Sequence, residues 1–236
     1  MAKKKRVQER TPEPTPEVAP TTPQKDAAES LVEWIQSHQR AVVAGVAALA
    51  VVVALGWFTF AYRKNKEEAA GEALNQARFA SQSGNFPLAA NDLSRVISQF
   101  RGTSAADEAV ILLAQVRLLQ EQPNLAAEEL EAAVSGLADQ FKAPAYGLLG
   151  TALENIGRMA DAASAYERAA GTSWYDAVAA QYLNDAARAK WVSGDIAGAI
   201  TTYEQVLEDY PESTSAAEAR VRVGELRATA VTPPNS

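Results

Sequence analysis

The stretch Tyr146–Ala169, YGLLGTALENIGRMADAASAYERA, contains two helical segments separated by a turn signal. A small residue occupies each segment, Gly150 in the first and Ala162 in the second, and Tyr166 follows Ala162 by one helical turn. Gly157 lies between the segments, where a glycine favours the end of a helix. The small residues allow two helices to approach closely, and the tyrosine fills the groove towards a neighbouring pair. The stretch therefore predicts a helical hairpin with one apolar face left to cover.

The same pattern recurs along the chain at a spacing of 36 or 37 residues. Turn residues fall inside each hairpin at Gly84, Pro123, Gly157 and Gly194. Between hairpins, Thr103/Ser104 and Ser213/Thr214 can cap the following helices. We predict an all-α solenoid of about four hairpins plus a capping helix over residues 66–230. The residues expected to pack the repeats are Ala77, Ala114, Gly150, Ala187 and Gly224 on the first helices, and Ala89, Ala126, Ala162 and Ala199 on the second, with Leu93, Leu130, Tyr166 and Tyr203 one turn on.

Residues 41–62 form an uninterrupted apolar stretch without a charged residue, His, Asn or Gln. A helix of this length covers roughly 33 Å, enough to cross a hydrocarbon core of roughly 30 Å. Aromatic residues gather at its C-terminal end, and Arg63, Lys64 and Lys66 follow, as at a membrane interface. Buried core helices usually run shorter and show a polar face, and a signal peptide would begin nearer the N-terminus and carry a small-residue cleavage site. We therefore predict one uncleaved N-terminal transmembrane helix.

Three further segments complete the expected organisation. Residues 1–25 hold a basic cluster and a proline-rich stretch, and we expect a disordered tail whose lysines either lie near anionic headgroups or are simply solvated. Residues 26–40 predict a short amphipathic helix, in which Leu31, Trp34, Ile35 and His38 share one face. Residues 231–236 are expected to be a disordered C-terminus.

Composition and charge restrict the function. Residues 1–40 carry seven Lys/Arg and six Asp/Glu, which leaves 15 and 23 for the remainder, a net charge of −8. That charge disfavours nucleic acid as a partner. The chain has no cysteine, one histidine (His38), no glycine-rich phosphate loop and no hydrolase motif. We expect no enzyme activity, no cofactor, no metal and no small-molecule substrate; the expected partners are proteins.

The spacing resembles that of the tetratricopeptide repeat, lengthened from its usual length of about 34 residues. The residues that carry this resemblance are Tyr146, Leu149, Gly150, Leu153, Gly157, Ala162, Tyr166 and Ala169. The whole layout resembles the ancillary SecYEG translocon subunit family, whose GxxW and SKGDxxGA stretches are similar to residues 171–174 and 193–199. The proline-rich tail and the terminal YPES at 210–213 depart from it, and YPES is closer to envelope division-coordinator and outer-membrane assembly lipoprotein repeat proteins.

Charge alone leaves the orientation open, because three Lys/Arg closely follow the span and only Arg40 closely precedes it, whereas the whole tail carries seven. The resemblance implies a single-pass bacterial inner-membrane protein with a cytoplasmic N-terminus and a periplasmic repeat domain. It also implies a protein-interaction adaptor near the translocon and its periplasmic chaperones, acting on exported proteins. The alternative, suggested by YPES, is a scaffold for envelope assembly or cell division.

The resemblance further implies a concave groove lined by the first helices of the hairpins. Trp191 and Arg188 are the expected anchors, since both residue types are common at binding hot spots; the alternative for Trp191 is packing between repeats. The Lys/Asn constellation that clamps a C-terminal carboxylate in other tetratricopeptide proteins is absent. The projected partner-binding positions are Gln115, Leu118, Leu119, Thr151, Glu154, Asn155, Gln181, Asn184, Arg188, Trp191 and Val192.

Overall fold

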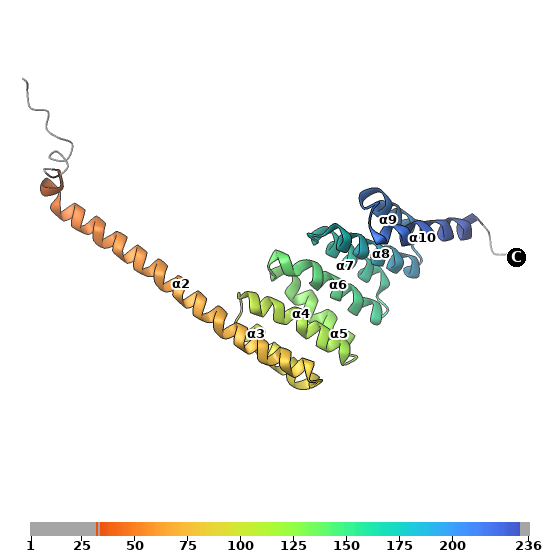
Figure 1. The fold of residues 1–236 in the computed structure, drawn as a ribbon, viewed down its shortest axis with the longest axis horizontal. Helices are drawn as coiled ribbons and strands as arrows, with labels where there is room; N and C mark the ends of the chain where they lie inside the picture. Colours follow the sequence, from red (N-terminus) through yellow and green to blue (C-terminus); the bar gives the residue numbers. More distant parts are fainter. Residues whose placement is uncertain (1–31, 33, 232–236) are drawn as a thin grey trace, which may run out of the picture. The chain divides into compact units, whose positions relative to one another are not determined.

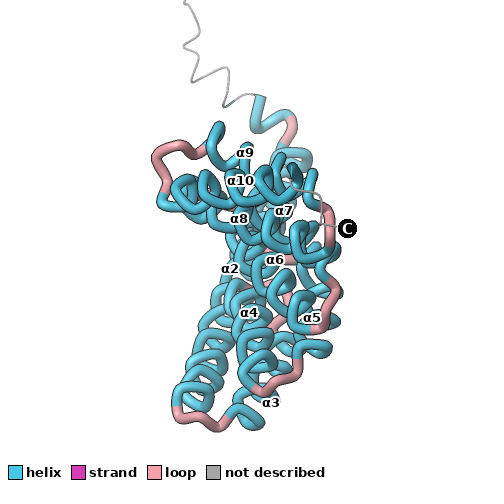
Figure 2. The backbone as a smooth tube through the Cα atoms, turned by 90° about the vertical axis from the view of Figure 1, so that its right-hand side faces the viewer, coloured by secondary structure: helices cyan, strands magenta, loops and turns pink. Residues whose placement is uncertain are grey.

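The computed structural model describes residue 32 and residues 34–231, except the side chains of residues 42, 230 and 231. The chain divides into two compact units, Met1–Phe58 and Thr59–Ser236. Within the described residues every regular element is a helix, as Figure 2 shows by colour. The prediction of an all-α chain is therefore confirmed.

The first unit is described from residue 32 on, apart from residue 33. Residues 34–37 are helical, His38 forms a turn, and helix α2 (Gln39–Gln82) then begins. Trp34 and His38 stack with ring centroids 5.0 Å apart. Much of the expected amphipathic helix, residues 26–31 and 33, and all of the tail lie outside the described residues. A segment of α2 is long and apolar enough to cross a membrane, and none of it is buried.

Helix α2 continues from the apolar stretch into the second unit without a break. The sequence from Arg63 to Gln82 is rich in Arg, Lys, Glu, Ala and Gln, which favour helix, and Lys64 pairs with Glu68 one turn later at 3.8 Å. The residues that end the apolar stretch and the first helix of the first hairpin therefore belong to one continuous helix.

The second unit is a stack of four hairpins and a final helix (Figure 1). The first hairpin consists of the end of α2 and α3 (Phe86–Gln99). The next pairs are α4 (Ser104–Leu119) with α5 (Pro123–Ala133), α6 (Asp139–Asn155) with α7 (Met159–Thr172), and α8 (Asp176–Ser193) with α9 (Ile196–Asp209). A 3-10 turn, η1 (Val134–Gly136), follows α5, and α10 (Thr214–Val231) closes the stack. The predicted number of repeats is correct.

Local sequence explains where the helices begin and end. Thr103 Oγ1 accepts a hydrogen bond from Ala106 N at 3.1 Å, and Ser213 Oγ accepts one from Ala216 N at 3.2 Å, so both are N-caps. The turns inside the first, third and fourth hairpins each use a glycine with positive φ. In the second hairpin Glu121 adopts φ 56° in place of a glycine, and Pro123 starts α5.

Small residues fill the contacts between helices. Ala77, Ala89, Ala162 and Ala199 are fully buried, and Tyr203 is 1% exposed. Gly150 lies against the Tyr166 ring, where an added Cβ would be 2.5 Å from the nearest ring carbon. Gly224 shares the register of Gly150 but is exposed, because no side chain of the described residues lies within 4 Å of where its Cβ would be. The remaining positions of the two small-residue series, Ala114, Ala126 and Ala187, are buried as well.

Candidate protein-binding surface

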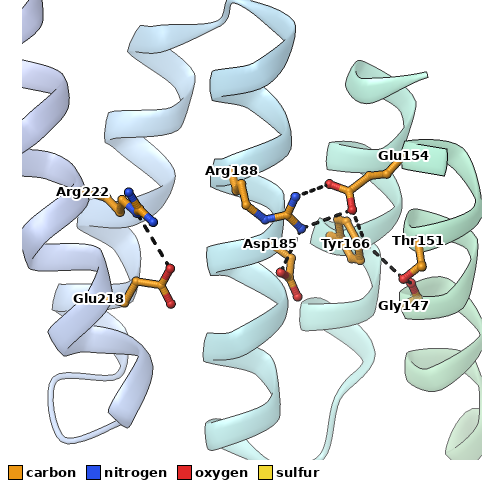
Figure 3. Close-up of polar contacts among 8 residues, drawn as sticks. All are labelled: Gly147, Thr151, Glu154, Tyr166, Asp185, Arg188, Glu218 and Arg222. Carbon is orange, nitrogen blue, oxygen red and sulfur yellow. Dashed lines mark hydrogen bonds and ion pairs between the residues drawn. The ribbon is translucent and has the colours of Figure 1, made fainter. Parts of the chain in front are cut away.

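The projected partner-binding positions lie on three first helices of hairpins, α4, α6 and α8. We call the outward surface of these helices and of the closing helix α10 the first-helix face. Helix α4 packs against α6, and α8 against α10, so their side chains lie in adjacent rows. Polar contacts join first helices along the stack: Arg78 on α2 pairs with Glu108 on α4, and Figure 3 shows the contacts of α6, α8 and α10 together. The contacts of α6, α8 and α10 include three of the projected positions, Thr151, Glu154 and Arg188.

Arg188 forms the centre of this region. Its guanidinium donates to both carboxylate oxygens of Glu154 on α6, at 2.7 and 3.2 Å, and to Asp185 on its own helix at 3.2 Å. The hydrogen bonds to Glu154 are the main cause that raises the pKa of Arg188. Two projected positions, Glu154 and Arg188, are thus brought into direct contact across neighbouring repeats.

Tyr166 joins the network from α7, behind the face. Its hydroxyl donates to Glu154 at 3.1 Å and lies 3.2 Å from Thr151 Oγ1. Burial raises the pKa of Tyr166 to about 12, so the phenol keeps the proton that it donates. The tyrosine expected to pack the repeats also holds Glu154 in place.

Negative charge exceeds positive charge around Arg188. Burial raises the pKa of Asp185, the bond from Arg188 opposes that shift, and the neighbouring charges of Glu154 and Glu218 add to it. Glu218 on α10 lies 3.9 Å from Arg222, which also contacts Glu225 at 3.0 Å. This part of the face can therefore attract a cationic or hydrogen-bond-donating segment of a partner.

Trp191 contacts the closing helix. The guanidinium carbon of Arg222 lies 5.8 Å from the centre of the indole ring, and the residue is 38% exposed. Trp191 thus both packs against α10 and presents part of its ring. Sequence reasoning did not select Arg222 or Asp185 for the face, although Arg222 follows Asp185 by 37 residues and shares its register.

The other projected positions differ in accessibility. Asn184 is 7% exposed and donates to the Ser215 carbonyl at 3.0 Å, so it fastens α10 to α8 and does not present its side chain to a partner. Leu118 is half-buried. Five positions are exposed, namely Gln115, Leu119, Asn155, Gln181 and Val192.

A separate hollow of about 610 Å³ lies between α3, α4, α5 and η1. Its lining is mainly apolar, with Ile97, Val110 and Leu137 among the larger side chains, and it includes none of the projected positions. Helix α5 has 11 residues, whereas α3, α7 and α9 have 14 each, so less helix covers the second repeat. The repeat spacing did not predict this hollow, because a constant period does not determine the length of each helix.

Four hairpins of nearly constant length, closed by a single helix, define a helical-repeat scaffold. Residues 69–184 match the tetratricopeptide repeat-like domain, and residues 184–230 match a tetratricopeptide repeat. The chain therefore carries a tetratricopeptide repeat-like domain, and repeats of this class imply a protein–protein interaction adaptor.

Solved structures agree on the fold. MamA superposes with a TM-score of 0.53 at 22% identity, over 65% of this chain and 84% of MamA. A Podosopora anserina protein with nearly identical TPR-like repeats gives a TM-score of 0.55 at 17% identity, over 70% of this chain and 88% of that chain. A tetratricopeptide repeat protein from Parabacteroides merdae gives 0.55 at 12% identity, over 69% and 61%. No curated protein matches the sequence.

Proposed function

We propose that the protein is a membrane-anchored adaptor that holds segments of other polypeptides on its first-helix face, with α2 as its anchor. The observation that carries this proposal is the Glu154–Arg188–Asp185 network beside the partly exposed Trp191. It combines fixed charges with an aromatic surface on helices of an interaction fold. Arg and Trp are both enriched where binding energy concentrates.

The specific role that we propose is that of an ancillary translocon subunit. The N-terminus lies in the cytoplasm, the repeat domain lies in the periplasm, and the partners are translocon subunits, periplasmic chaperones or exported proteins. The support is the order of anchor and repeats and the similarity of residues 171–174 and 193–199 to that family's stretches. Arg63, Lys64 and Lys66 favour the opposite orientation by the positive-inside rule, but long domains translocate largely regardless of charge, so these residues do not prevent this one.

The second candidate is a scaffold for envelope assembly or division, supported by the YPES residues before α10. Here Ser213 caps α10, which accounts for the serine through helix geometry. Fluorescent fusions distinguish the two candidates, because a division scaffold concentrates at the septum and a translocon subunit does not.

Site-specific photocrosslinking in cells tests the proposal. Val192 is the best position for the probe because it is 58% exposed and adjoins Trp191, whose own ring is engaged with Arg222. The matched control is a probe at Leu125 on α5, a second helix, which is 40% exposed. We expect products with translocon subunits, periplasmic chaperones or exported proteins from Val192 and not from Leu125. Equal products from both positions, or none from Val192, would contradict a binding role for the first-helix face.

A further inference from the structure

Two aromatic side chains project from the turn between α7 and α8. Trp174 and Tyr175 are 68% and 71% exposed, and Val178, in the first turn of α8, is 38% exposed. The turn itself is well held, since Ser173 Oγ donates to the Tyr175 carbonyl at 3.1 Å and accepts from Tyr175 N at 3.2 Å. A fixed turn thus presents a small apolar surface, Trp174, Tyr175 and Val178, which we call the aromatic turn.

The residues of α2 that follow the apolar stretch contact the turn between the first two hairpins. Lys66 Nζ donates to the Arg101 carbonyl at 2.7 Å. The Glu67 carboxylate accepts hydrogen bonds from Ser104 N at 3.3 Å and Ala105 N at 3.2 Å, at the start of α4. The turn between the first two hairpins is therefore tied to α2 only four or five residues after the apolar stretch ends. That separation is roughly 6 to 8 Å along the helix axis.

The turns that lead into α4, α6 and α8 lie along the same edge of the second unit, as Figure 1 shows. This follows from the hairpin order, because each first helix starts at the edge where the previous second helix ends. The edge begins beside Lys66 and Glu67 and includes the aromatic turn. If α2 leaves a bilayer at Tyr62, the start of this edge lies only four or five residues along α2 from the bilayer surface.

The chemistry of the aromatic turn suits that surface. Trp and Tyr favour the membrane interface, where the ring meets the hydrocarbon boundary and the polar group stays hydrated. Attraction to anionic lipid does not explain it, because residues 41–236 carry a net charge of −8 and Asp176 adjoins Tyr175. Contact through neutral rings requires no anionic lipid.

We propose that the aromatic turn inserts into the headgroup region of the bilayer that α2 crosses, and so gives the repeat domain a second attachment to the membrane. This inference rests on the proposed membrane anchor. The partner that the aromatic turn contacts is lipid, because the apolar stretch of α2 ends next to the edge on which the turn lies. The attachment restrains rotation of the repeat domain about the α2 axis. It therefore fixes which side of the first-helix face lies nearest the membrane.

The test uses the full chain in phosphatidylcholine vesicles that carry a nitroxide-labelled lipid. The chain has no cysteine, so Gly171→Cys provides a single site for an environment-sensitive fluorophore beside the aromatic turn. An added Cβ at Gly171 meets nothing within 4 Å. The matched control is Ser193→Cys, in the exposed turn at the opposite end of α8. We expect quenching at position 171 to exceed that at position 193 by about twofold or more, as for an interfacial site against an aqueous one.

A second variant links the signal to the rings. Replacing Trp174 and Tyr175 by Ser in the Gly171→Cys chain should reduce quenching to the level at position 193, with unchanged far-ultraviolet circular dichroism. Flotation of the protein together with the vesicles measures membrane attachment through α2 separately. Protein that floats while position 171 is quenched no more than position 193 would overturn the aromatic-turn contact and leave the anchor standing. Protein that does not float would overturn both.

Discussion

Arg188 and Glu154 form a two-point contact between α8 and α6, with nitrogen–oxygen distances of 2.7 and 3.2 Å. The side chain of Glu154 is 15% exposed, so the carboxylate has little access to water and depends on protein donors. Tyr166 supplies another donor from α7. The pair therefore joins three consecutive helices and stabilises the part of the face proposed to bind partners.

Replacing Arg188 by Ala should lower the free energy of unfolding by about 1 to 3 kcal/mol, because it leaves a nearly buried carboxylate without its cation. This loss of unfolding free energy is smaller than for a fully buried ion pair, since the Arg188 side chain is 42% exposed. Arg188→Lys should recover only part of the loss, as an ammonium cannot make both bonds. Urea unfolding of the detergent-solubilised chain measures these changes. The control Arg95→Ala breaks the pair with Asp92 at 3.2 Å and should cost less than about 0.5 kcal/mol; equal losses would contradict the assigned role.

Gly150 and Gly224 occupy the same register in two repeats but meet different surroundings. A Cβ on Gly150 would lie 2.5 Å from the Tyr166 ring, whereas one on Gly224 meets nothing within 4 Å. We expect Gly150→Ala to destabilise the fold by about 1 to 3 kcal/mol through overpacking. Gly224→Ala should be neutral or stabilise by up to about 1 kcal/mol, because alanine favours helix. Thermal unfolding of both variants measures the difference, and a similar loss in the two would show that register alone, and not contact with Tyr166, sets the requirement.

Tyr166 should make stability depend on pH in the alkaline range. Burial raises its pKa from 10.0 to about 12. Between these values the unfolded chain releases the phenol proton and the folded chain retains it, so this stabilisation is complete below pH 10 and is lost as pH rises towards 12. The stability advantage of the native chain over Tyr166→Phe should shrink by on the order of 1 kcal/mol between about pH 9 and about pH 11. Urea unfolding at the two pH values measures it, and an advantage that stayed constant would contradict a buried, proton-retaining phenol.

Repeat spacing predicted the architecture because each hairpin must bury small residues at fixed positions, and that requirement is visible in the sequence. The predicted caps at Thr103 and Ser213 could be identified for a similar reason, since a cap depends on residues within one turn. The 193–199 stretch also reports local geometry. Gly194 adopts φ 92° at the end of α8, and Asp195 accepts from Gly198 N at 2.9 Å, where a side chain on residue 198 would collide with the aspartate. Similarity in this stretch therefore informs the fold more than the identity of a partner.

The details of the face could not be predicted, because they depend on how neighbouring helices are offset. Position within a repeat predicted Glu154 and Arg188 as binding residues, but it did not predict that they contact each other. It also predicted Asn184 as a binding residue, although that side chain is buried against α10. Arg222 was not predicted to belong to the face, because only the packing of α10 brings it to Trp191. Charge pairs between helices need three-dimensional distances that periodicity does not contain.

Glu121 provides a final prediction, since it holds a positive φ of 56° at the turn where the other three hairpins have glycine. A left-handed conformation costs a residue with a side chain roughly 1 kcal/mol relative to glycine. Glu121→Gly should therefore stabilise the second hairpin by about 0.5 to 1 kcal/mol, despite the greater freedom of glycine in the unfolded chain. Urea unfolding measures the gain, with Gln122→Gly as the control, because Gln122 has φ −113° and gains nothing from glycine. Because α5 is the shortest of the second helices, hydrogen exchange of its amides should slow in Glu121→Gly and not in Gln122→Gly. A loss of stability in Glu121→Gly would contradict this prediction, since it would show that contacts of the glutamate outweigh its backbone strain.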